Sequence, residues 1–221
     1  IDSGLQMMGG YGFIEEYTMA RLYRDCRIDR IWEGTNEINR QIITGYIMKK
    51  ALMEELPIQG AIREIEQYMN NGKLETDSEI LLAESNVVET SKRLALFLLN
   101  EGICEFGQDL KHQQQIADIL ANIFIDIYVA ESTVLRAKKM LGNPTSPPSV
   151  ETVAKIFVAE MAQRMVQLAE TALKGIYNGD LSPLMHESLN AFRSRMYLPT
   201  NTIGLKREIA AYAYSKTSYP Y

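Results

Sequence analysis

The stretch Tyr23-Arg-Asp-Cys-Arg-Ile-Asp-Arg-Ile-Trp-Glu-Gly-Thr-Asn-Glu-Ile-Asn-Arg40 places one carboxylate, that of Glu33, between an apolar pair and a glycine. We expect Ile31 and Trp32 to keep water from this carboxylate, because a shielded carboxylate takes up a proton more readily and suits the role of a general base. Gly34 has no side chain and lets a second molecule approach the backbone. The stretch therefore predicts a base held in a loop.

The residues that follow this loop predict a helix. Thr35 is a candidate cap, since a threonine hydroxyl can accept a hydrogen bond from a free first-turn N–H. The helix is expected over residues 36–55 and ends before Pro57, which has no N–H to donate inside a helix. This proline divides the chain into two predicted units, residues 1–56 with the base loop and residues 57–221.

The periodicity of the whole chain predicts an all-α protein. Apolar residues recur at helical spacing almost throughout, and no stretch alternates in the way that a half-buried strand requires. Long segments with short connections favour an antiparallel helical bundle in the second unit. The expected helices cover residues 1–8, 18–27 (with Thr18 as a candidate cap), 36–55, 58–69, 78–107, 109–141, 149–177 and 180–195, with a last turn or two in 205–214. A polar connector is expected over residues 73–77.

Composition excludes several classes of function. The 221 residues carry 23 basic and 28 acidic side chains, a net charge of −5, which disfavours nucleic acid as a partner. Cys26 and Cys104 lie far apart with no Cys/His cluster, so no metal site is predicted, and a reducing compartment is expected. No apolar run approaches the ~20 residues of a membrane-spanning helix. The chain begins at Ile1, inside a predicted helix, and is expected to be a fragment of something longer.

Three motifs of the first unit resemble those of one enzyme family. Gln6-Met-Met-Gly-Gly-Tyr-Gly-Phe13, then Arg24-Asp25, then Ile31-Trp-Glu-Gly-Thr-Asn-Glu-Ile-Asn-Arg40 resemble, in content and spacing, the C-terminal helical domain of FAD-dependent acyl-CoA dehydrogenases. The resemblance covers about the first forty residues.

The second unit is similar to the extra helical domain of the very-long-chain branch of that family and of its bacterial relatives. This likeness rests on Asp118-Ile-Leu-Ala-Asn-Ile-Phe-Ile-Asp-Ile-Tyr128, followed by Ser132 and Arg136-Ala137. It implies that residues 57–221 form an additional helical bundle domain.

The resemblance implies a reaction and a set of site residues. Family members convert a fatty acyl-CoA to a trans-2-enoyl-CoA in fatty acid β-oxidation, with FAD taking a hydride and an electron-transfer flavoprotein as partner. Glu33 would be the base and Gly34 would contact the substrate. Thr35, Asn36 and Glu37 would lie near the diphosphate and adenosine of FAD.

The glycine-rich stretch is implied to act across a subunit interface. Gln6, Met7, Met8, Gly9 and Gly10 match the family stretch that reaches the FAD of a neighbouring subunit, so the active unit would be at least a homodimer. The domains that supply most of the flavin and acyl-chain contacts in the family are not part of these residues. The chain alone is therefore expected to be inactive and not to bind FAD.

Several alternatives stay open at this point. The chain could be a non-catalytic helical interaction or assembly module derived from the same family. Arg21, Arg24, Arg27 and Arg30 recur every third residue, and a solvated face with ion pairing to Asp25, Asp29 and Glu33 is favoured over phosphate binding. Packing of residues 58–69 on the bundle is favoured over peripheral membrane contact, because the charges of this segment are mixed. The expected location is the cytoplasm of a bacterium or the matrix side of a eukaryotic mitochondrion.

Overall fold

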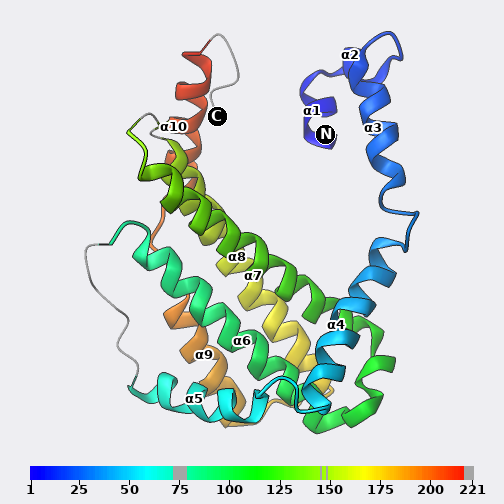
Figure 1. Cartoon of the computed structure of the whole chain (residues 1–221), viewed down its shortest axis with the longest axis vertical. Helices are drawn as coiled ribbons and strands as arrows, with labels where there is room; N and C mark the ends of the chain where they lie inside the picture. Colours follow the sequence, from blue (N-terminus) through cyan, green and yellow to red (C-terminus); the bar gives the residue numbers. More distant parts are fainter. Residues whose placement is uncertain (72–78, 145, 148, 217–221) are drawn as a thin grey trace.

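A computed structural model describes residues 1–71, 79–144, 146–147 and 149–216, and these residues contain helices and no strand, which confirms the all-α prediction. The elements are shown in Figure 1. They are α1 (Asp2–Met7), α2 (Gly10–Phe13), α3 (Thr18–Ile28), α4 (Asn36–Leu52), α5 (Ile58–Asn71), α6 (Leu82–Phe106), the 3-10 helix η1 (Gly107–His112), α7 (Gln114–Leu141), α8 (Ser149–Ile176), α9 (Pro183–Arg195) and α10 (Thr202–Tyr214).

The centre of the molecule is a bundle formed by α6, α7, α8 and α9, in which α7 runs antiparallel to α6 and α8 (Figure 1). Side chains from α6, α7 and α8 fill its core, and the largest of them have no exposed surface. These are Leu94, Leu98, Leu99, Leu120, Ile123, Met161, Met165 and Leu173. Phe192 of α9 closes the core against Phe97, with ring centroids 5.7 Å apart. The long predicted helices therefore form the expected bundle.

Several helix boundaries differ from the sequence prediction: α4 ends at Leu52 rather than residue 55, α9 begins at Pro183 rather than residue 180, and α10 is a helix of 13 residues that begins at Thr202. Two further differences, at α7 and α6, follow from buried side chains. The helix expected from residue 109 is preceded by η1, because the buried side chain of Leu110 packs against Gly102, where an added Cβ would lie 3.1 Å from Leu110 Cδ1. Leu81 is buried in a left-handed conformation, with φ 58°, so α6 starts four residues later than expected. Thr18 is the first helical residue and makes no cap hydrogen bond. The predicted connector over 73–77 lies outside the described residues.

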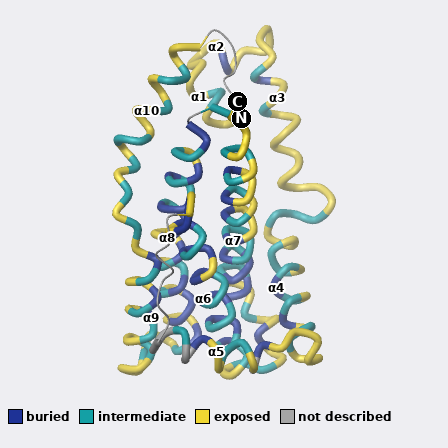
Figure 2. Tube along the Cα trace, turned by 60° about the vertical axis from the view of Figure 1, so that its left-hand side comes forward, coloured by how far each residue is buried: buried dark blue, intermediate teal, exposed yellow. Residues whose placement is uncertain are grey.

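The first three helices form an arm outside the bundle, defined here as residues 1–28. α1, α2 and α3 pack on one another, and Figure 1 shows them projecting past the end of α4. α4 itself crosses the first part of α7. Along the arm the trace in Figure 2 is mostly exposed or intermediate, whereas α7 and α8 have buried residues at regular intervals along their length.

α5 packs on α6 across one end of the bundle, as predicted. Ile58 and Ile65 are buried in the common core. The ring of Tyr68 lies between the guanidinium groups of Arg93 and Arg195, at 4.1 and 4.5 Å from the ring centroid. In the part of the chain that the structure describes, no helix is both long and apolar enough to cross a membrane.

Candidate functional site

Glu33 lies in the base loop, defined here as residues 29–35, which joins α3 to α4. The start of α4 is fixed by Thr35, whose Oγ1 accepts a hydrogen bond from the backbone N–H of Ile38 at 3.3 Å. This confirms the predicted cap. The backbone N–H of Asn36 donates to the carbonyl of Arg30 at 3.2 Å, so the loop closes on itself.

The backbone of the loop is strained at Glu33. Its φ is 52°, in the left-handed region that costs a residue with a Cβ about 1 kcal/mol or more. Gly34 follows with φ 88°, and a Cβ there would lie 2.8 Å from Asn39 Oδ1. The amide of Asn39 donates to the Gly34 carbonyl at 2.9 Å and holds this conformation. Strained residues of this kind are found at functional sites more often than elsewhere.

The expected shielding of Glu33 by its apolar neighbours is wrong within this chain. Glu33 is exposed, and Ile31 and Trp32 are 53% and 57% exposed. The indole N–H of Trp32 donates to Asp29 Oδ1 at 3.0 Å, and this hydrogen bond fixes the orientation of the ring. Among the described residues, no hydrogen bond or ion pair engages the Glu33 carboxylate. Any apolar cover for this group must therefore come from outside these residues.

The first turn of α4 contains the other acidic residue of the site. Glu37 is exposed, and its pKa is lowered because its carboxylate accepts hydrogen bonds from its own backbone N–H and from the Thr35 hydroxyl. The charges of Arg40 and Arg27 lower the pKa further. These bonds use N–H donors of the first turn of α4. A diphosphate could therefore lie beside this turn, but those N–H groups are not available to bind it.

Gln6, Met7, Met8, Gly9 and Gly10 lie at the turn between α1 and α2. Gly9 has φ 58°, and no atom lies within 4 Å of the position where a Cβ would project from Gly9 or Gly10. Met7 is 83% exposed. This open, apolar turn fits close contact with a flat group or a neighbouring chain. The 11 residues of α3 separate it from the base loop by about 16 Å of helix, so the structure does not bring the two predicted groups together.

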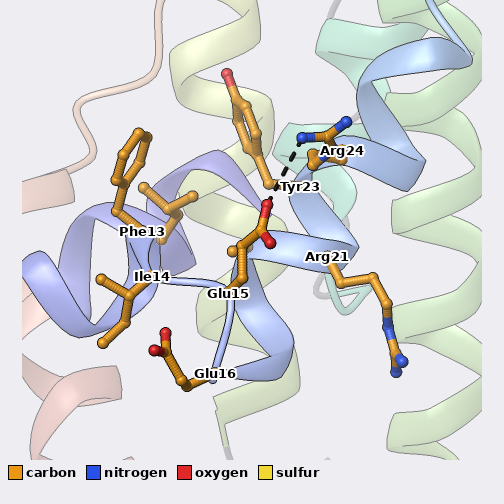
Figure 3. Close-up of a pocket in the computed structure, with 9 residues that line it drawn as sticks. Phe13, Ile14, Glu15, Glu16, Arg21, Tyr23 and Arg24 are labelled. Carbon is orange, nitrogen blue, oxygen red and sulfur yellow. Dashed lines mark ion pairs between the residues drawn. The ribbon is translucent and has the colours of Figure 1, made fainter.

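A cavity that sequence reasoning missed lies inside the arm (Figure 3). Its volume is about 840 Å³. Apolar side chains of all three helices and of the α2–α3 turn form its wall, and charged residues form its rim. The lining residues are Leu5, Phe13, Ile14, Glu15, Glu16, Ala20, Arg21, Tyr23 and Arg24. The apolar pair Phe13-Ile14 before Glu15-Glu16 is the signal that could have indicated such a boundary between wall and rim.

The arginine stripe, Arg21, Arg24, Arg27 and Arg30, is exposed, which confirms the predicted solvated face, but the predicted ion-pair partners are wrong. Arg24 pairs with Glu15 at 3.8 Å (Figure 3), and both side chains are largely exposed. Among the described residues, none of Asp25, Asp29 and Glu33 forms an ion pair with the stripe. The stripe is a solvated face of α3 in this chain.

Comparison with known proteins places this chain in a family. Two family models, both described as the acyl-CoA dehydrogenase C-terminal domain, match residues 1–48 and 90–190. A probable acyl-CoA dehydrogenase of Bacillus subtilis is 35% identical over 99% of this chain and 37% of its own length. The CarC subunit of the caffeyl-CoA reductase-Etf complex of Acetobacterium woodii is 48% identical over 46 residues, 21% of this chain and 12% of that protein.

A solved structure shares the fold as well as the sequence. The crystal structure of an acyl-CoA dehydrogenase complexed with FAD from Bacillus anthracis matches with a TM-score of 0.85 and 31% identity, over 97% of this chain and 36% of that one. The chain thus spans little more than a third of the length of these relatives. Because two models of this domain match the chain and a relative aligns over 99% of it, the chain belongs to the acyl-CoA dehydrogenase family.

Proposed function

We propose that this chain is the C-terminal part of an FAD-dependent acyl-CoA dehydrogenase that converts a fatty acyl-CoA to a trans-2-enoyl-CoA in fatty acid β-oxidation. Glu33 is the base that removes the proton from the carbon next to the thioester carbonyl. The observation that carries this proposal is the geometry of Glu33, a carboxylate with no partner among the described residues, presented from a strained and hydrogen-bonded loop.

The base loop can position this carboxylate and admit the substrate. The bonds from Asn39 to Gly34 and from Asn36 to Arg30 hold the backbone on both sides of Glu33. Gly34 leaves room for the thioester to approach, since it presents no side chain. Such a base typically contributes a factor of about 10²–10⁴ to the rate, and exclusion of water strengthens its action. The exposed Ile31 and Trp32 supply part of an apolar wall that a covering domain would complete.

FAD, when bound, supplies the acceptor for the hydride that leaves the neighbouring carbon of the substrate. The open turn of Gln6, Met7, Met8, Gly9 and Gly10 would contact it from a neighbouring subunit, which makes the proposed active unit a homodimer or a higher homo-oligomer. The edge of α4 at Thr35, Asn36 and Glu37 would lie near its diphosphate and adenosine. The space around Gly9 and Gly10 supports the first contact.

The proposed electron acceptor is an electron-transfer flavoprotein. The relative from Acetobacterium woodii belongs, by its name, to a complex with such a protein. Since the chain lacks most of the length of its relatives, we propose that it neither binds FAD nor turns over substrate by itself.

A second candidate function is a non-catalytic interaction or assembly module. One observation favours it: Tyr128 and Leu135 of α7, seven residues apart on one helix face, are 73% and 60% exposed. A full-length protein that purifies without flavin would favour this function over the enzyme.

Replacement of Glu33 tests the proposal. Glu33→Gln in the full-length enzyme keeps the size of the side chain and removes its basicity, and we expect kcat to fall by about 10²–10⁴. Glu54→Gln is a matched control, because Glu54 is also an exposed glutamate with a left-handed backbone, φ 57°, at the other end of α4. A fall of less than about tenfold for Glu33→Gln, or an equal fall for both variants, would contradict the assignment.

A further inference from the structure

Arg40 of α4 joins the first turn of its own helix to α7 of the bundle. Its Nη1 donates to the carbonyl of Asn36 at 2.9 Å, and its Nε donates to Asn122 Oδ1 at 2.8 Å, across 82 residues of sequence. Its guanidinium also lies 3.6 Å from Asp118 Oδ1. One side chain thus contacts the residue that begins α4 and two residues of the bundle.

The α7 side of this contact is built as a unit. The amide of Asn122 donates to both the carbonyl and the Oδ2 of Asp118, each at 2.9 Å, so its oxygen is turned toward Arg40. The Arg40 and Asp118 side chains are only partly exposed, at 28% and 40%, where an ion pair is less screened than on an open surface. A charged group with several fixed partners has little freedom to change rotamer.

Two further hydrogen bonds fasten the same stretch of α4 to the start of α7. The hydroxyl of the buried Thr44 donates to the carbonyl of Ala117 at 2.7 Å, and the amide of Gln41 donates to the carbonyl of Gln114 at 3.0 Å. Met48, one turn after Thr44, is buried in the bundle core. The middle of α4 is therefore fixed to the bundle by side chains from Arg40 to Met48, which span about two turns of the helix.

This attachment acts on the base loop through the first residues of α4. Asn39, next to Arg40, donates to the Gly34 carbonyl, and Asn36, whose carbonyl Arg40 holds, donates to the Arg30 carbonyl. We propose that Arg40, Asn122 and Asp118 are positioning residues through which the second helical unit fixes the conformation of the base loop. The inference rests on the proposed function in one respect, that the side chain so positioned is the catalytic base.

Trp32 offers a readout of loop position that needs neither flavin nor substrate. It is the only tryptophan in the 221 residues and sits beside Glu33. In this chain, Asn122→Ala is expected to lower the fluorescence anisotropy of Trp32, because Arg40 loses its hydrogen-bond partner on α7 at the start of α4. The control is Asp126→Ala, which removes the bidentate ion pair of the Asp126 carboxylate with Arg164, at 2.9 and 2.9 Å, and so breaks a contact of α7 with α8 rather than with α4. The control is expected to leave the anisotropy unchanged.

Kinetics of the full-length enzyme give the second readout. Asn122→Ala is expected to lower kcat about tenfold with little change in KM, since a displaced base affects the chemical step more than binding. Arg40→Lys keeps the charge opposite Asp118 and most of the fold, but replaces Nε and Nη1, which bond separately to Asn122 and Asn36, with a single ammonium group, so it is expected to lower kcat in the same direction.

The outcomes separate the two proposals. If Asn122→Ala and Arg40→Lys behave like Asp126→Ala in both readouts, the positioning inference is wrong, whatever Glu33→Gln does. If they change Trp32 anisotropy while Glu33→Gln keeps full activity, the bundle positions the loop and the assignment of the base falls.

Discussion

The bundle buries its large apolar side chains, whereas the arm leaves many of them exposed to solvent. In the bundle, Leu98 and Met161 have no exposed surface, whereas in the arm Phe13 is 77% and Met7 83% exposed. The bundle thus completes a core from its own sequence. The arm, with its apolar cavity and open glycine turn, presents surfaces that other residues must cover.

The first prediction measures this contrast directly. Leu98→Ala is expected to lower the free energy of unfolding of the chain by about 3 kcal/mol, because it leaves a cavity in a packed core. Phe13→Ala is expected to change it by less than about 0.5 kcal/mol, since the ring is mostly in water already. Urea denaturation followed by circular dichroism measures both. A large loss for Phe13→Ala would show that the arm has a core of its own in this chain.

A second prediction concerns the base loop, between the two regions. Gly34→Ala is expected to lower the free energy of local opening of the loop by about 1–2 kcal/mol, because alanine is strained in the left-handed backbone and its Cβ would contact Asn39. Because the bundle does not depend on this loop, the urea midpoint should stay in place. Hydrogen exchange of the Asn36 and Ile38 amides should speed up about tenfold. Unchanged exchange would mean that the loop accepts a side chain at this position.

The smallest expected effect is a pH dependence of the stability of the first turn of α4. The folded pKa of Glu37 lies below its ordinary value, so the stabilisation of the first turn of α4 is present above that ordinary value and is lost as pH falls through the folded pKa. Exchange of the Ile38 amide, corrected for its intrinsic pH dependence, should report this loss. Glu37→Gln should abolish the pH dependence, and its persistence in that variant would assign it to another group.

The elements predicted correctly from the sequence are those with local causes. Thr35 caps α4 because the hydroxyl and the first-turn N–H are three residues apart, and α4 ends before Pro57. The long helices of the bundle follow from apolar periodicity alone. The break at Gly107, where η1 begins, matches a predicted helix boundary. The later start of α7 at Gln114 and the left-handed Leu81 were not predictable, because Leu110 and Leu81 are buried and no glycine or proline at positions 81 or 113 marks the break.

For the candidate site, the sequence predicted the loop that contains Glu33 but not the exposure of that residue. The motif located Glu33 and Gly34 in one loop, and the structure shows how that loop is held. The exposure of Glu33 could not be read from Ile31 and Trp32, since whether neighbours cover a side chain depends on which way the backbone turns between them. Likewise, Arg40 and Asn122 each lie within a recognised motif, yet their contact follows only from the way α4 crosses α7.

The seating of α4 on α7 bears on how this protein can be dissected. A truncation that starts at Pro57 would remove Thr44 and Met48, leave the carbonyl of Ala117 to water and open one side of the bundle core. A recombinant piece that starts shortly before Asn36 would keep these partners and discard only the arm. We expect the longer piece to be the better behaved of the two on expression and crystallisation.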